Sequence, residues 1–164
     1  MKSEVIKKCR ICNSKKIQKV FSLGNISHAG IFPSRISSNV PKDHITVVYC
    51  KNCSLVQLDR NFNLNYMFGK NYGYRSAINK TMKSHLESLT KKIEKKFNIK
   101  NGDYVLDIGS NDATLLNSYQ KSFKKVGIDP LVKKYQKSYK KIDHKISNFF
   151  EAKHIKKLNT PKFK

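Results

Sequence analysis

The chain has 164 residues, of which 38% are hydrophobic, so it can form one ordinary domain or two small ones with a lean core. It carries a net charge of +23, and 30 of its 34 basic residues are lysines. Nucleic-acid surfaces rely more on arginine and interleaved aromatic residues, so this composition speaks against a nucleic-acid partner and favours solvated helix faces. No apolar segment has the length of a signal-peptide core or a membrane span, which predicts a cytoplasmic protein with reduced cysteines and no membrane partner.

The N-terminal 66 residues contain all four cysteines, in two C-x-x-C pairs. In each pair a tight turn can direct both sulfur atoms at one ion, and two such turns complete a tetrahedral site with no open position. Short apolar runs at 17–21, 46–49 and 55–58 resemble the hairpins of a zinc ribbon. We therefore predict a small α+β, zinc-ribbon-like domain over residues 1–66 that needs structural Zn²⁺ to fold. The predicted ligands are Cys9, Cys12, Cys50 and Cys53.

Other interpretations of these cysteines stay open. A redox-active C-x-x-C or free core thiols would give the same pairs, and His28 or His44 could replace one cysteine in the metal site. The 37 residues between the pairs exceed the usual spacing of a zinc ribbon. This spacing predicts an inserted loop that includes GNISHAGIFPSR (24–35).

Residues 67–100 are predicted to form a linker and an amphipathic helix. The segment NYGYRS (71–76) places Tyr72 and Tyr74 immediately before this helix. Apolar residues then recur at steps of three or four, which predicts a helix of about six turns with one stripe packed in a core. The stripe consists of Ile78, Met82, Leu86, Leu89, Ile93 and Phe97.

Residues 101–164 alternate between strand and helix patterns. Apolar runs predict buried parallel strands at 104–108 and 125–129, and a third strand within 144–150. One helix is expected after the turn GSNDA (109–113), and another from Pro130. This order predicts a Rossmann-like α/β domain, in which ligands bind beyond the carboxyl ends of the strands.

The loop after the first of these strands distinguishes between two ligand classes. A dinucleotide site needs glycines at three positions, where this chain has Gly109, Asn111 and Thr114. S-adenosylmethionine needs one glycine, an acid at the strand end near its amino group and an acid after the second strand for its ribose hydroxyls. Asp107, Gly109 and Asp129 meet these needs, so we predict an S-adenosylmethionine site. An ordinary βαβ turn without a ligand is the alternative.

Together these motifs resemble those of a known family. The order C-x-x-C, C-x-x-C-S-L-V-Q-L, Y-x-Y-x-S, a histidine nine residues on, and V-L-D-I-G-S-N-D is similar to the sugar C-methyltransferases. These class I, S-adenosylmethionine-dependent enzymes have an N-terminal zinc-binding domain and methylate a carbon of nucleotide-linked keto-deoxysugars. The resemblance implies that Ser110 and Asn111 join the donor site. It also implies that Tyr72 or Tyr74 is a catalytic residue near the sugar.

The chain departs from the family pattern in two ways. Glycine is usual at the position of Ala113, and the extra methyl group is expected to weaken donor binding. Family members also continue into a fourth strand and a C-terminal domain that carries acid–base groups. We therefore expect residues 101–164 to be the truncated N-terminal half of the donor-binding domain, inactive alone, with strand 104–108 at an exposed edge.

Three interpretations follow. The first is part of a sugar C-methyltransferase, with a nucleotide-linked deoxysugar as substrate. The second is a zinc-ribbon module that binds nucleic acid through a basic tail. The third is the non-catalytic half of a split methyltransferase, whose partner is a separately encoded C-terminal half.

Overall fold

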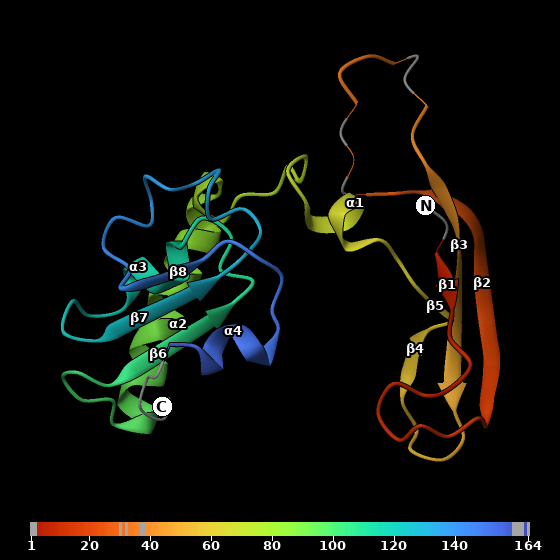
Figure 1. Cartoon of the computed structure of the whole chain (residues 1–164), viewed down its shortest axis with the longest axis horizontal. Helices are drawn as coiled ribbons and strands as arrows, with labels where there is room; N and C mark the ends of the chain where they lie inside the picture. Colours follow the sequence, from red (N-terminus) through yellow and green to blue (C-terminus); the bar gives the residue numbers. More distant parts are fainter. Residues whose placement is uncertain (1–2, 30, 32, 37–38, 159–162, 164) are drawn as a thin grey trace. The chain divides into compact units, whose positions relative to one another are not determined.

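The computed structural model describes residues 3–29, 31, 33–36, 39–158 and 163. The chain divides into two compact units, residues 1–73 and 74–164, and each is described by itself (Figure 1). Among the helices of these described residues, none is long and apolar enough to cross a membrane.

The first unit is built on a three-stranded antiparallel sheet, as its apolar runs predict. The strands β2 (Ile17–Ser27), β3 (Lys42–Cys50) and β4 (Val56–Leu58) lie in the order β2-β3-β4. The predicted inserted loop is shorter than expected, because Gly24–Ser27 continue β2 and pair with the start of β3. The register of the β2–β3 pairing shifts twice, near Phe21 and near Gly24, as at β-bulges, and the two strands stay paired on both sides of each shift.

A short two-stranded sheet and one helix complete this unit. β1 (Glu4–Val5) pairs with β5 (Arg60–Asn61), and α1 (Leu64–Phe68) follows. The buried hydrophobic residues of the described part of this unit are Cys9, Val48 and Cys50. An apolar core this small does not hold a domain of about 70 residues, so the unit depends on a further cross-link.

The second unit contains a parallel sheet, in agreement with the strands predicted from the apolar runs. β6 (Tyr104–Ile108), β7 (Lys124–Ile128) and β8 (His144–Ile146) lie in the order β6-β7-β8 (Figure 1). β8 uses only the first three residues of the segment in which the third strand was expected. The carboxyl ends of β6 and β7 are in register, with Asp107 opposite Gly127, so the loops that follow them share one edge of the sheet.

The helices between these strands are less regular than predicted. The helix after GSNDA is the short α3 (Thr114–Ser118), and α4 (Ala152–Lys156) follows β8. The helix predicted from Pro130 is wrong: residues 130–141 form consecutive turns. Several of these turns are closed by bonds between residues three apart, such as Ser138 N to the Tyr135 carbonyl, instead of the four-residue α-helical bond.

A helix precedes the parallel sheet. A 3₁₀ turn (Ser76–Ile78) leads into α2 (Lys80–Phe97), whose amino end is capped by Asn79. α2 contacts α3. The apolar stripe is packed only in its middle, because Ile78, Met82 and Phe97 are exposed. The core prediction is therefore wrong for both ends of the stripe.

β6 forms one edge of the parallel sheet, as the sequence predicts. Beyond it the described chain adds a single parallel bridge, between Tyr104 and Phe163. The ring of Phe163 meets that of Tyr104 edge-on, with centroids 6.2 Å apart. Ile108, at the carboxyl end of β6, is 53% exposed, so this end of the edge is open.

Candidate functional site

The four cysteines of the first unit converge on one point. Their sulfur atoms all lie within 4.8 Å of one another, and the Cys9–Cys53 and Cys12–Cys50 pairs are each 3.6 Å apart. Four thiolates around one zinc ion, with Zn–S bonds of about 2.3 Å, place the sulfurs about 3.8 Å apart. The observed cluster therefore has the size of a tetrahedral zinc site.

The backbone shows why each pair aims both sulfurs at the same place. Cys9 N donates to the Ser14 carbonyl and Asn13 N donates to the Cys9 carbonyl; Cys50 makes the same two bonds with Leu55 and Ser54. The residue after each second cysteine, Asn13 or Ser54, has a positive φ, of 58° and 61°. Two turns of the same design thus face each other, and neither depends on a glycine.

The chemistry of the donor set also fits zinc. The backbone N–H of Cys12 lowers the pKa of the Cys9 thiol to about 6 against the opposing effect of burial, which favours the thiolate form that binds a metal. Four sulfur ligands leave no open position, which makes the site structural rather than catalytic. The two histidines considered as substitutes lie elsewhere: His28 contacts Asp43 at 2.9 Å, and His44 contacts Ser22 at 2.7 Å.

Arg10, inside the first C-x-x-C pair, connects the metal site to the rest of the unit. Its guanidinium donates to the carbonyls of Leu58 and Arg60, at 2.7 and 2.8 Å, and to the side chains of Gln57 and Asn61. Arginine can satisfy several acceptors at once because its donors form a rigid fork. The first knuckle is therefore fixed to β4 and β5 across about 50 residues of sequence.

The second predicted site lies in the loop after β6. Gly109, Asn111 and Ala113 all have positive φ, of 77°, 47° and 61°, so the loop turns sharply at every second residue. A Cβ placed on Gly109 would meet nothing within 4 Å, so the side of the loop at this residue is open space. Ala113 is fully buried in the core cluster with Leu116 and Tyr139. Its methyl group therefore packs in the core, and its effect on donor binding stays a prediction.

Asp107 has the electrostatics of a ligand-binding carboxylate. Burial, and then the negative charge of Asp129, raise the pKa of Asp107 to about 6, and no hydrogen bond from the described residues offsets them. The side chain is only partly buried and stands at the carboxyl end of β6. A ligand cation beside this carboxylate would offset both effects, so the position suits an amino group.

Asp129 has a different environment from the one expected of it. Its two carboxylate oxygens accept the backbone N–H groups of Asn111 and Leu131, at 2.9 and 2.7 Å, and the residue is 8% exposed. The carboxylate thus holds the loop after β6 against the loop after β7. A direct contact with ribose hydroxyls stays a prediction.

Ser110 and Asn111 also hold the loop in place through hydrogen bonds. The Tyr139 hydroxyl donates to the Asn111 carbonyl at 2.9 Å, so the Ser110 hydroxyl, 2.7 Å away, donates to the tyrosine oxygen. A Cβ on Gly127 would come within 3.0 Å of Leu116, Ser110 and Tyr139 side-chain atoms. Gly127 therefore allows this close approach over β7, a requirement that the sequence motif alone did not reveal.

An ion pair that sequence reasoning missed links the linker to this loop. The buried Asp112 accepts from Arg75 Nε and from the backbone N–H of Ala77, both at 3.0 Å. The Arg75 guanidinium also lies over the Tyr135 ring, 5.4 Å from its centroid. The adjacent pattern of a tyrosine, an arginine and a serine before the helix was the available signal, but only the tyrosines were singled out.

The two predicted tyrosines have different places in the structure. The Tyr74 carbonyl accepts from the Asn111 side-chain amide at 3.1 Å, which brings residue 74 beside the loop, and its side chain is half exposed. Tyr72 belongs to the first unit, where its ring meets that of Phe68 edge-on. Of the pair, only Tyr74 belongs to the same unit as Asp107 and Gly109.

Comparison with known proteins addresses the first unit. Residues 9–68 match the family model Methyltransf_13, described as "Putative zinc binding domain". A search of curated proteins gives no match. Together with the four-sulfur cluster, this match makes the N-terminal unit a methyltransferase-associated zinc-binding domain.

Proposed function

We propose that this chain carries the structural zinc and the donor-binding loop of an S-adenosylmethionine-dependent C-methyltransferase. The observation that carries the proposal is the position of Asp107, a carboxylate with a raised pKa that stands next to the open side of Gly109. The zinc-binding domain that precedes it is of the methyltransferase-associated kind, which supports the same class of enzyme.

The donor fits the loop by the chemistry of its parts. In the proposal the Asp107 carboxylate pairs with the donor amino group, and the open side of Gly109 leaves room for the donor to approach the backbone. Ser110, Asn111 and Asp129 act by holding the loop in its sharply turned form, and each carboxylate oxygen of Asp129 retains a lone pair for a ribose hydroxyl. When bound, the donor supplies an electrophilic methyl group.

The proposed acceptor is a carbon of a nucleotide-linked keto-deoxysugar. The motif order resembles that of enzymes with this substrate, and the net charge of +23 favours the approach of a ligand with a pyrophosphate. Tyr74 is the better placed of the two candidate tyrosines, because its backbone is bonded to the donor loop. We further propose that acid–base groups on a C-terminal half complete the sugar site, so that turnover needs both parts.

Isothermal titration of the zinc-loaded chain with S-adenosylmethionine tests the proposal. We expect a dissociation constant in the micromolar range, and a loss of at least about tenfold in Asp107→Asn, because a charge-assisted bond contributes roughly 1.5–3 kcal/mol. Asp103→Asn is the matched control, since it makes the same chemical change just before the amino end of β6, opposite to Asp107. Absence of binding by the unmodified chain, or an equal loss in both variants, would contradict the proposal.

A further inference from the structure

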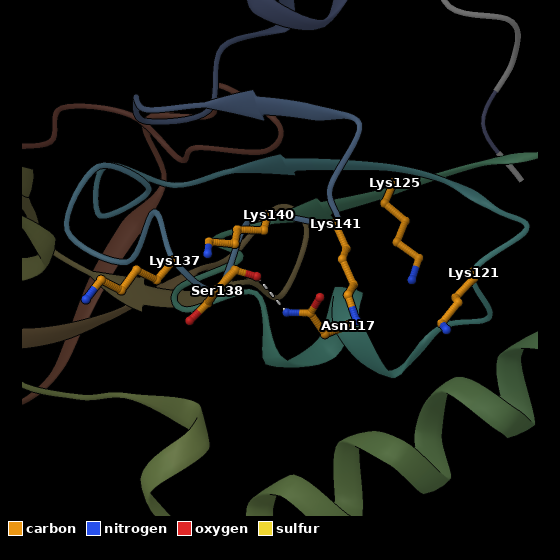
Figure 2. Close-up of a pocket in the computed structure, with 7 residues that line it drawn as sticks. All are labelled: Asn117, Lys121, Lys125, Lys137, Ser138, Lys140 and Lys141. Atoms are coloured by element: carbon orange, nitrogen blue, oxygen red, sulfur yellow. Dashed lines mark hydrogen bonds between the residues drawn. The ribbon is translucent and has the colours of Figure 1, made fainter.

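A cationic groove lies on the second unit, away from the proposed donor site. It has a volume of about 560 Å³, which is within the usual range for small-molecule sites. Its lining consists of Asn117, Lys121, Lys125, Lys137, Ser138, Lys140 and Lys141 (Figure 2). Five of these seven residues are lysines, and none is acidic.

The topology separates this groove from the donor loop. Lys121 precedes β7 and Lys125 is near its amino end, opposite Val105 in β6, whereas Asp107 and Gly109 are at the carboxyl end. The other three lysines come from the turns before β8. The groove therefore opens toward the amino ends of the strands, where neither the methyl donor nor its acceptor is proposed to bind.

The floor of the groove is held together by the fold. The Asn117 side-chain amide, on α3, donates to the Ser138 carbonyl at 2.9 Å, and this bond joins the helix to the turns before β8. Figure 2 shows Lys121 and Lys125 on one side of this bond and Lys137 on the other. The positive charges thus flank a fixed polar centre that comes from two separate segments of the chain.

The five lysines of the groove have no direct carboxylate partner among the described residues. Lys125 is buried, and its ammonium group donates to the Tyr119 carbonyl at 2.8 Å. Burial lowers the pKa of Lys125; the charges of Asp143 and Glu94 oppose this effect, and the charge of Lys141 adds to it to a smaller degree. An anion in the groove would offset the cost of burying this ammonium group.

We propose that this groove binds a diphosphate group, either inorganic pyrophosphate or the diphosphate of a nucleotide. Lysine ammonium groups bind phosphate as compact point charges, and several of them along a groove match several linked phosphates better than one. A single orthophosphate or sulfate would reach only some of the five charges, so we expect it to bind more weakly than pyrophosphate.

Titration of the zinc-loaded full chain with pyrophosphate at fixed ionic strength, followed by calorimetry and by backbone amide NMR, tests this site. We expect Lys137→Ala/Lys141→Ala to weaken pyrophosphate binding about tenfold, since two of the five charges that face the anion are lost. Lys156→Ala/Lys157→Ala removes the same charge from exposed positions outside the groove and should leave binding unchanged. Shifts of the amides of Asn117, Tyr119 and Lys125 should accompany binding.

Further titrations distinguish inorganic pyrophosphate from a nucleotide diphosphate as the ligand, and distinguish the groove from the proposed donor site. Adenosine diphosphate that binds as well as pyrophosphate, while adenosine does not, identifies the diphosphate as the recognised group. Asp107→Asn should leave pyrophosphate binding intact even if donor binding is lost, so failure of one proposal does not decide the other. An equal loss in both lysine pairs, or tighter binding of a DNA oligonucleotide that removes the amide shifts from the groove, would overturn the proposal.

Discussion

Replacement of Asp107 by asparagine should stabilise the protein at neutral pH while it weakens donor binding. The pKa of Asp107 is raised from 3.8 to about 6 by burial and by Asp129. The folded state therefore holds the Asp107 proton more tightly than the unfolded state does, and ionisation of this carboxyl group destabilises the fold. An asparagine side chain at this position cannot ionise and avoids this cost.

The magnitude and the pH range follow from these two pKa values. A difference of about 2 in pKa corresponds to roughly 3 kcal/mol, and contact of the partly exposed carboxylate with water reduces this to roughly 1–2 kcal/mol. The destabilisation is absent below pH 3.8, grows as the pH rises toward 6, and is constant above that value. The stability gained by Asp107→Asn should therefore be greater at about pH 7.5 than at about pH 5.

Urea denaturation at both pH values, with zinc present, measures the difference between the variant and the parent. Because both proteins share the same metal site, any effect of pH on zinc binding cancels in this difference. The ¹³C shift of the Asp107 carboxyl group gives its pKa directly. A pKa near 3.8, or a variant that is less stable than the parent near neutral pH, would refute the view that this carboxylate is poorly solvated.

Three further changes test other parts of the molecule. Metal analysis should find one zinc ion per chain, and Cys50→Ser should abolish zinc binding. In this variant the NMR signals of residues 3–73 should lose their dispersion, whereas those of 74–158 should keep it. If the signals of 3–73 stay dispersed in the variant, the first unit folds without metal. Tyr139→Phe deprives Ser110 and the Asn111 carbonyl of a partner and should lower the free energy of unfolding by about 1–3 kcal/mol in urea; an unchanged value would show that the bonds do not form in solution. Ala113→Gly removes the conformational cost of a left-handed alanine, roughly 1–2 kcal/mol, because glycine adopts this backbone freely. It also removes a buried methyl group, whose burial stabilises the fold by about 0.8 kcal/mol. Stability should change by about 1 kcal/mol or less and donor affinity by less than about twofold, and a tenfold gain in affinity would place the methyl group in the donor site.

Features with a local sequence signal could be predicted from the sequence. The two-residue spacing within each cysteine pair indicates a knuckle and predicted the four-sulfur cluster, although it left a redox pair or a histidine ligand open. Strands 104–108 and 125–129 also appear as short apolar runs, and the central strand β7 is buried along most of its length, as a parallel strand covered on both faces should be. The helix periodicity located α2 but overstated its packing, since periodicity shows which residues share a face and does not show what covers that face.

Features that depend on distant residues had no such signal. The Arg75–Asp112 ion pair joins positions 37 residues apart, and nothing in the local composition of either segment indicates the other. Asp129 was predicted from its place after a strand, but its actual bonds depend on how the two loops meet in space. Residues 130–141 form turns in place of the predicted helix, and Tyr139 and Ile142 are buried in the core cluster, a contact with distant residues that the local sequence does not indicate.

The bonds of Arg10 give the metal an influence well beyond its four ligands. When zinc leaves, the first knuckle loses its anchor, and the guanidinium that holds Leu58, Arg60 and Asn61 leaves with it. The pairing of β1 with β5 then loses its support, and the chain on both sides becomes accessible to proteases that cleave after basic residues. Loss of the metal is therefore expected to make the N-terminal unit more sensitive to such proteases.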